Sequence, residues 1–281
     1  MKKIKQFVNS TYLILVITGI VITSSIYSLQ VTGQSIPLRR NYNNEKLNFI
    51  PPPTANQNAN DNELGRPRNR SSGGGRNPCL EQLIALVPGS GEVEIQEGTC
   101  DTALESFLAL TLDDRPTFFF YVPQESKSGL DAEFVLLDDN RKFIDKWEIS
   151  LSGKPGVVSF QIPQPLKETG KEYQWLFSLL IHPRNPADNP TVEGMVKVVE
   201  LDSDLDSKLS TITEPRERIV FYANHHIWHD ALTSLANLNC KNNGDSTLVT
   251  DGHNDWYNLL NSVGLGAIAQ TPLVDYCTTD E

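Results

Sequence analysis

Short apolar segments, each closed by a proline or a turn sequence, recur through the middle of this chain. Pro116 and Pro123 enclose one of them, and Asp138, Asp139 and Asn140 separate two others as a hairpin turn would. Segments of this kind are typical of β-strands, and about seven at regular spacing predict an antiparallel sandwich. The expected strands cover residues 83–87, 117–122, 132–137, 142–151, 157–162, 173–181 and 192–201.

One local pattern narrows the class of sandwich. Gly170 precedes Tyr173 and Trp175 at the start of an expected strand. In immunoglobulin domains, a tyrosine in this place bonds back to the backbone of the preceding connection. We therefore predict an immunoglobulin- or fibronectin III-like antiparallel β-sandwich with Tyr173 as the corner tyrosine, Trp175 as a core aromatic and Gly170 as a turn residue. An ordinary strand after a glycine turn is the alternative.

The periodicity becomes helical after residue 201. Thr213 can cap a helix that has Pro215 in its first turn. One helical face is apolar and carries Ile227, Ala231, Leu232, Leu235 and Leu238. We expect a mainly β protein in which residues 79–201 form the sandwich and residues 202–281 form a helical unit packed on or beside it. The stretch 92–114 does not fit a tight sandwich, and within it we interpret residues 102–110 as a short helix.

The N-terminal part predicts export. Lys2, Lys3 and Lys5 precede an apolar run over residues 12–26, and small residues follow as far as Gly33. This order is typical of a signal peptide, here residues 1–33. The run has about 15 residues, whereas a helix that spans a membrane needs roughly 20, which favours a signal peptide. An uncleaved membrane anchor is the alternative. Residues 34–78 are rich in proline, asparagine and glycine and predict a disordered linker.

The cysteines fit an oxidising compartment such as the periplasm or the cell surface. The four cysteines, Cys79, Cys100, Cys240 and Cys277, allow three pairings, and the sequence does not choose among them. Local pairing would join Cys79 to Cys100 and Cys240 to Cys277. A zinc site is the competing interpretation, but no C-x-x-C spacing is present.

The charge excludes one class of partner. The chain has a net charge of −11, of which the first 30 residues contribute +3 and residues 31–78 contribute +4, which leaves −18 on residues 79–281. A body with this charge repels nucleic acids and anionic membrane surfaces. The remaining partners are a protein or a glycan of the envelope.

Two histidines are the sharpest chemical candidates. His225 and His229 are four residues apart, so that on one continuous helix they would share a face suited to zinc or copper. A third ligand would have to come from Asp251 or His253. The alternative is a set of exposed polar residues at a turn between helices.

A second candidate metal site has the acidic spacing of a calcium loop, in Asp202, Asp204 and Asp206, but the glycine and the final glutamate of such a loop are missing. No catalytic motif and no cofactor is predicted.

Three aromatic residues of the helical unit are candidates for a partner surface. Trp228, Trp256 and Tyr257 are core or interface anchors, and any that are exposed would mark the place where a partner binds.

A series of short segments recurs in order along the folded part of the chain: Leu83-Ile-Ala-Leu-Val-Pro88, Arg115-Pro-Thr-Phe-Phe-Phe-Tyr-Val-Pro123, Ala132-Glu-Phe-Val-Leu136, Gly156-Val-Val-Ser159, Gly170-Lys-Glu-Tyr173, Val192-Glu-Gly194 and Ile227-Trp-His-Asp-Ala-Leu232. In order and spacing they resemble the cyanobacterial family known as domain of unknown function 928. The resemblance implies an exported protein with this layout and implies no activity. The chain departs from the family pattern at residues 89–114 and at His225, His226 and His229.

These observations favour an exported envelope protein that acts as a non-catalytic binding or scaffold module for a protein or glycan. One alternative is a metal-binding protein or metal-dependent enzyme that uses His225 and His229. Another is a structural surface component that assembles with itself through open sheet edges.

Overall fold

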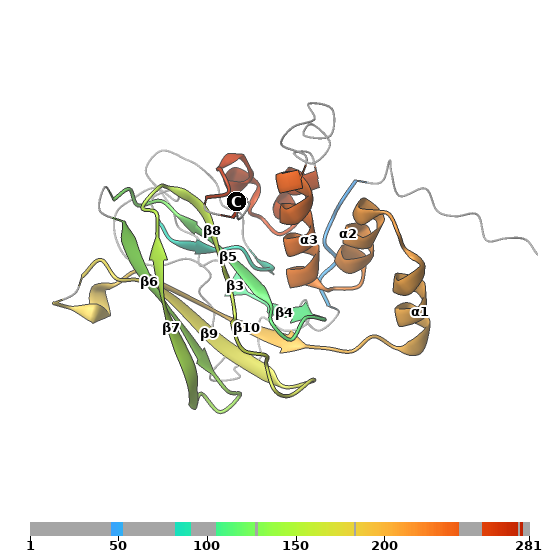
Figure 1. The fold of residues 1–281 in the computed structure, drawn as a ribbon, viewed down its shortest axis with the longest axis horizontal. Helices are drawn as coiled ribbons and strands as arrows, with labels where there is room; N and C mark the ends of the chain where they lie inside the picture. Colours follow the sequence, from blue (N-terminus) through green and yellow to red (C-terminus); the bar gives the residue numbers. More distant parts are fainter. Residues whose placement is uncertain are drawn as a thin grey trace, which may run out of the picture. The chain divides into compact units, whose positions relative to one another are not determined.

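The computed structural model of the chain describes residues 46–52, 82–90, 105–126, 129–182, 184–241, 255–274 and 276–277 (Figure 1). All of them belong to one compact unit, residues 41–281. The expected signal peptide, Cys79, Cys100, Asp251 and His253 lie outside the described residues. In the part of the chain that is described, no helix has the length and apolar character needed to cross a membrane.

Two main sheets form the β part. They confirm the prediction of a mainly β fold followed by a C-terminal helical region. The larger sheet has the order β4-β10-β9-β6-β7 and the smaller has the order β1-β5-β8. The larger sheet consists of β4 (Leu108–Thr111), β6 (Leu130–Leu137), β7 (Phe143–Leu151), β9 (Glu172–Leu179) and β10 (Thr191–Val198). The smaller consists of β1 (Ile84–Ala85), β5 (Thr117–Val122) and β8 (Gly156–Gln161), and a separate pair consists of β2 (Gly89–Ser90) and β3 (Glu105–Ser106).

The helix expected at residues 102–110 is wrong where the chain is described. Residues 105–106 and 108–111 are the strands β3 and β4, and β4 pairs with β10 in parallel. The larger sheet is therefore mixed, whereas the strand pairs of the smaller sheet are antiparallel, as predicted. Leu108 and Leu110 alternate with Ala109 and Thr111, whose side chains are fully buried. This period of two is that of a strand, and pairing with β10 fixes it.

The first core lies between the two sheets. Phe118, Phe120 and Val122 of β5 pack in one cluster with side chains of the larger sheet, including Phe134 and Trp175. The ring of Phe120 stacks on that of Phe177 with 3.8 Å between centroids. Large apolar side chains that are fully buried in this way each stabilise a fold by about 1.5–3 kcal/mol.

The second core lies on the opposite face of the smaller sheet. Phe119 and Tyr121 of β5 join a cluster made mainly of helical residues, so both faces of β5 are buried. A strand covered on both faces has no reason to alternate between apolar and polar residues. This explains the unbroken apolar run from Phe118 to Val122.

The helices supply the layer over this face. They are α1 (Ser203–Thr211), α2 (Pro215–Asn224), α3 (Trp228–Lys241), a helical segment over residues 255–261 and the 3-10 helix η5 (Gly266–Gln270); a further 3-10 helix, η4 (Pro186–Asp188), precedes β10. Asp202 caps α1, because its carboxylate accepts hydrogen bonds from the backbone N–H groups of Asp204 and Leu205. The spacing of Asp202, Asp204 and Asp206, which is similar to that of a calcium loop, therefore reflects the N-terminal cap and first turn of α1.

Part of the expected linker is packed into this layer. Leu47 and Phe49 are almost fully buried, and the ring of Phe49 meets that of Trp228 edge-on at 5.0 Å. The backbone N–H of Phe49 donates to Ser262 Oγ at 2.9 Å, and that of Ile50 donates to the Ala223 carbonyl at 3.1 Å. The disorder predicted for residues 34–78 is therefore wrong for residues 46–52, which we call the N-terminal strap. The proposed domain boundaries stay a prediction.

Candidate functional site

The two candidate metal ligands lie on different elements. α2 ends at Asn224 and α3 begins at Trp228, because His226 between them has a φ of 68° that no α-helix can hold. His225 Nδ1 is 2.7 Å from the Phe221 carbonyl and its ring stacks on Phe221. His226 Nδ1 is 2.6 Å from the Ile50 carbonyl of the N-terminal strap. Both imidazoles thus bind backbone carbonyls.

His229 is a core residue. Its side chain is 2% exposed, and its Nδ1 donates to the Thr117 carbonyl at 3.0 Å. Nε2 is buried and has no hydrogen-bond partner among the residues that the structure describes, and the Phe118 ring lies 4.8 Å from the imidazole. Burial lowers the pKa of His229 to about 4, and the hydrogen bond to the Thr117 carbonyl raises this pKa by a smaller amount. The imidazole is therefore neutral at physiological pH.

A metal site on these histidines stays a prediction. Among the described residues, no group of three or more His, Cys, Asp or Glu side chains comes together. The third ligand considered from the sequence, Asp251 or His253, lies outside those residues.

Two of the three aromatic candidates do not form a partner surface. Trp228 is fully buried and its Nε1–H donates to the Leu86 carbonyl at 2.9 Å, while Trp256 is 3% exposed. Both are therefore core anchors, one of the two roles expected from the sequence, and they pack against Phe49 of the N-terminal strap and Phe119 of the smaller sheet, respectively. Tyr257 is 45% exposed and remains accessible.

A disulfide ties the end of the helical layer together. Cys240 of α3 is bonded to Cys277, with 5.2 Å between their Cα atoms. Such a bond persists in an oxidising compartment, which indicates an extracytoplasmic location.

Tyr173 links the larger sheet to the connection before it. Its hydroxyl accepts a hydrogen bond from the backbone N–H of Glu168 at 3.2 Å, and its side chain is 4% exposed. Gly170 lies between them with a φ of 82°, a conformation that favours glycine. Trp175 is fully buried, and its indole lies where a side chain at Gly194 on the neighbouring strand would be.

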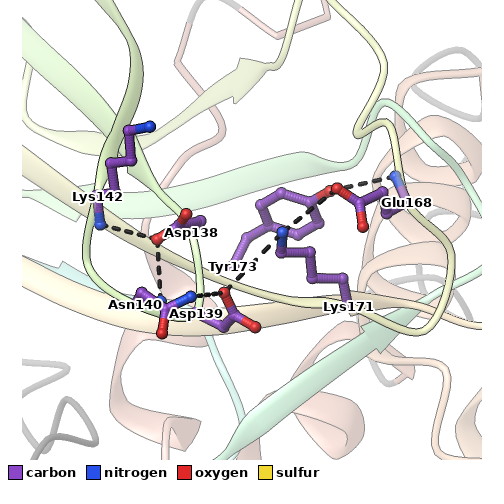
Figure 2. Close-up of polar contacts among 7 residues, drawn as sticks. All are labelled: Asp138, Asp139, Asn140, Lys142, Glu168, Lys171 and Tyr173. Carbon is purple, nitrogen blue, oxygen red and sulfur yellow. Dashed lines mark hydrogen bonds and ion pairs between the residues drawn. The ribbon is translucent and has the colours of Figure 1, made fainter.

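Polar contacts extend from this corner to the turn between β6 and β7 (Figure 2). Lys171 Nζ lies 3.3 Å from Glu168 Oε1 and 4.0 Å from Asp139 Oδ1. Within the turn, Asp138 Oδ1 accepts from the backbone N–H groups of Asn140 and Lys142. The ion pair between Lys171 and Asp139 thus connects the corner to the turn, although an exposed pair of this kind adds little stability.

The outer face of the larger sheet carries apolar side chains. Strand register places Val135 opposite Leu176, and places Leu137, Gln174, Met195 and Leu108 in one row across the sheet. These residues alternate with the core-facing Phe134, Leu136, Trp175 and Val196, so they point away from the core. Five of them are partly exposed and belong to neither core cluster: Leu108, Val135, Leu137, Leu176 and Met195. We call these five the outer patch.

Charged residues border the outer patch. On the β10 side, Glu193 Oε2 accepts a hydrogen bond at 3.0 Å from Nε2 of Gln174, a buried side chain that lies between Leu137 and Met195. On the β7 side, Lys146 Nζ lies 2.6 Å from Glu133 Oε2 and 4.0 Å from Glu148 Oε1. An apolar centre with a polar rim is the usual composition of a protein-binding surface. Sequence reasoning missed this surface, although the consecutive apolar residues Val135, Leu136 and Leu137 were its signal.

The β6–β7 hairpin extends the apolar area to the sheet edge. The strand register shifts between Leu136 and Leu137, where Asp145 and Phe143 are the partners and Ile144 is the extra residue of a bulge. Phe143 is 57% exposed and Ile144 is 42% exposed.

The surface also has a hollow lined mainly by polar groups. It lies beside the end of β5 and is lined by residues that include Gln124, Asp131, Ser150 and Leu180. Gln124 Oε1 is buried and has no hydrogen-bond partner in the described ranges of the chain, whereas Asp131 Oδ1 accepts from Ser150 Oγ at 3.2 Å.

Two packed sheets, a helical layer on one face and a disulfide thus define a mixed β domain of an oxidising compartment. The model of the DUF928 family, Domain of Unknown Function, matches residues 67–273. The chain therefore belongs to this family, as its sequence segments predicted. Membership brings no activity and no partner with it.

Other comparisons add little. No curated protein matches the chain. Among solved structures, a β-glucuronidase of Parabacteroides merdae with glycerol in its active site is similar at 16% identity over 30% of this chain. The chain spans 11% of that enzyme, with a TM-score of 0.22, and we infer neither fold nor function from this similarity.

Proposed function

We propose that this chain is an exported, non-catalytic module that holds a protein partner against the outer face of its larger sheet. The outer patch carries the proposal: five partly exposed apolar side chains lie together there and belong to neither core cluster. Aliphatic side chains that a fold leaves outside its core in this way mark interaction sites. The predicted signal peptide and the Cys240–Cys277 disulfide support a partner in the envelope.

The chemistry of the patch favours a protein over a glycan. Its members are Leu, Val and Met, and Phe143 at the sheet edge is the nearby exposed aromatic residue. A surface of aliphatic groups with a charged rim matches a partner that has apolar side chains of its own. The polar hollow around Asp131 is the place where a glycan would bind instead.

Photo-crosslinking in the intact envelope tests this proposal. A photoreactive amino acid at position 176 or 195 reports on the outer patch, and the same amino acid at the exposed Ser207 of α1 is the control. We expect one protein adduct of constant size from positions 176 and 195 and none from 207. The proposal fails if 207 gives the same adduct, if the patch positions give none, or if the adduct resists protease and is a glycan.

A further inference from the structure

The strand β7 is the open edge of the larger sheet. Within the described part of the chain it pairs with β6 alone, and it is nine residues long. The other long edges are covered, since α3 contacts β4 and Leu273 forms a bridge with β8. An open edge of this length is a template for a further strand.

The charges on β7 are incompletely matched within one copy. Glu133 and Glu148 lie directly opposite each other on β6 and β7, a like-charged pair that destabilises a sheet. Lys146 is shared between them, at 2.6 Å from Glu133 and 4.0 Å from Glu148. The side chain of Glu148 is 75% exposed, so it can accept a second cation from outside.

We propose that β7 pairs antiparallel with β7 of a second copy, about a two-fold axis at Trp147, and joins the two larger sheets into one. Lys146 of each copy then faces Glu148 of the other, so the second copy supplies the cation that Glu148 lacks. On the inner side the two Trp147 side chains meet, and each already packs against Phe134 and Phe160 of its own copy.

Other registers of the same pairing are unfavourable. Sliding by a single residue would turn core-facing side chains outward, so allowed registers differ by two residues. One step in either direction places Lys146 against Lys146 or Glu148 against Glu148. A further step places Asp145 against Asp145 in one direction, and in the other it pairs Ile149 with Ile149 over a shorter overlap of the strands. The register that overlaps the whole strand is therefore also the one with complementary charges.

The bulge at Ile144 limits the size of this interface. It interrupts the regular ladder beside Asp145, so the continuous part of the new pairing is centred on residues 145–149. The contact is the edge of the sheet and leaves the outer patch on its face free. Pairing of two copies thus goes beyond the proposed function, and either can fail alone.

Charge reversal with complementary mixing is the test, in the full chain purified with its disulfide intact. In a pair of identical copies, Lys146→Glu sets two carboxylates against each other at both contacts, and Glu148→Lys sets two ammonium groups against each other there. A mixture of the two variants brings opposite charges together at both contacts. Lys167→Glu reverses an exposed lysine outside β7 and is the matched control.

Sedimentation velocity over a concentration series gives the readout. We expect a monomer–dimer equilibrium for the unmodified chain and for Lys167→Glu, at least tenfold weaker dimerisation for each β7 variant alone, and recovery in the equimolar mixture. Recovery excludes misfolding as the cause, because both variants must be native to restore the contact. The inference is wrong if the unmodified chain is monomeric throughout, if neither variant weakens the dimer, or if the mixture stays monomeric.

Discussion

His229 makes stability depend on pH in a way that can be isolated. The neutral imidazole donates from Nδ1 to the Thr117 carbonyl and leaves Nε2 as a buried acceptor without a partner. Protonation would place a second N–H on Nε2, which has the Phe118 ring beside it and no hydrogen-bond partner within the described part of the chain. The cationic form is therefore excluded from the folded state until the pH is far below 6.5.

The size of the effect follows from the two pKa values. In the folded protein the pKa of His229 is about 4, and in the unfolded chain it is 6.5. Between these values the unfolded chain binds a proton that the folded protein does not, so stability falls as the pH falls from 6.5 to 4. The difference of 2.5 units corresponds to ~3 kcal/mol of unfolding free energy.

Urea unfolding from pH 7.5 to pH 4 measures this loss. His229→Asn keeps a donor near the position of Nδ1 and removes the titration, so the free-energy difference between the unmodified protein and the variant isolates this residue from the carboxylates. We expect the advantage of the unmodified protein over the variant to shrink by ~3 kcal/mol on acidification. An NMR titration of the His229 ring is the independent check. A difference that does not change with pH, or a ring that titrates near 6.5, would refute the reasoning.

Three further changes test other parts of the fold. Phe49→Ala should cost about 3 kcal/mol in urea unfolding because it opens a cavity against Trp228, whereas Ile50→Ala at a 46% exposed position should cost far less. Tyr173→Phe should cost about 1 kcal/mol, since it removes the acceptor for the Glu168 N–H; a loss near zero would show that water replaces the hydroxyl. Replacing Cys240 and Cys277 by alanine should cost about 4 kcal/mol, from the unfolded-state loop of 37 residues that the disulfide closes; calorimetry that finds the same unfolding temperature would contradict this.

The strands were readable from sequence where local signals and tertiary packing agree. The run around Phe119 lies between two prolines and is buried on both faces, so its apolar character and its boundaries identify it as a strand. The sequence of residues 108–111 does not distinguish a strand from a helix, because four residues rich in leucine and alanine are too few to show a periodicity. Parallel pairing with β10, which is remote in sequence, fixes their conformation.

The arrangement of the candidate site residues depends on backbone conformation and strand register, which the sequence does not reveal. The spacing of His225 and His229 predicts a shared face only on a continuous helix, and the left-handed conformation of His226 that interrupts it has no signal in the sequence. The outer patch requires the register of four strands before its members can be seen as neighbours. Leu47 and Phe49 were hidden because two apolar residues in a polar segment do not show where they pack.

The N-terminal strap also determines how the protein bears tension. It bonds to the end of α2 on one side and to Ser262, just after the helical segment 255–261, on the other, and is drawn in blue near α2 and α3 in Figure 1. A pull on the preceding part of the chain therefore acts first on the contacts of Phe49 with Trp228 and Ser262, and only afterwards on the sheets. Release of residues 46–52 would break these contacts and leave the strand pairing of the larger sheet, which carries the outer patch, unchanged.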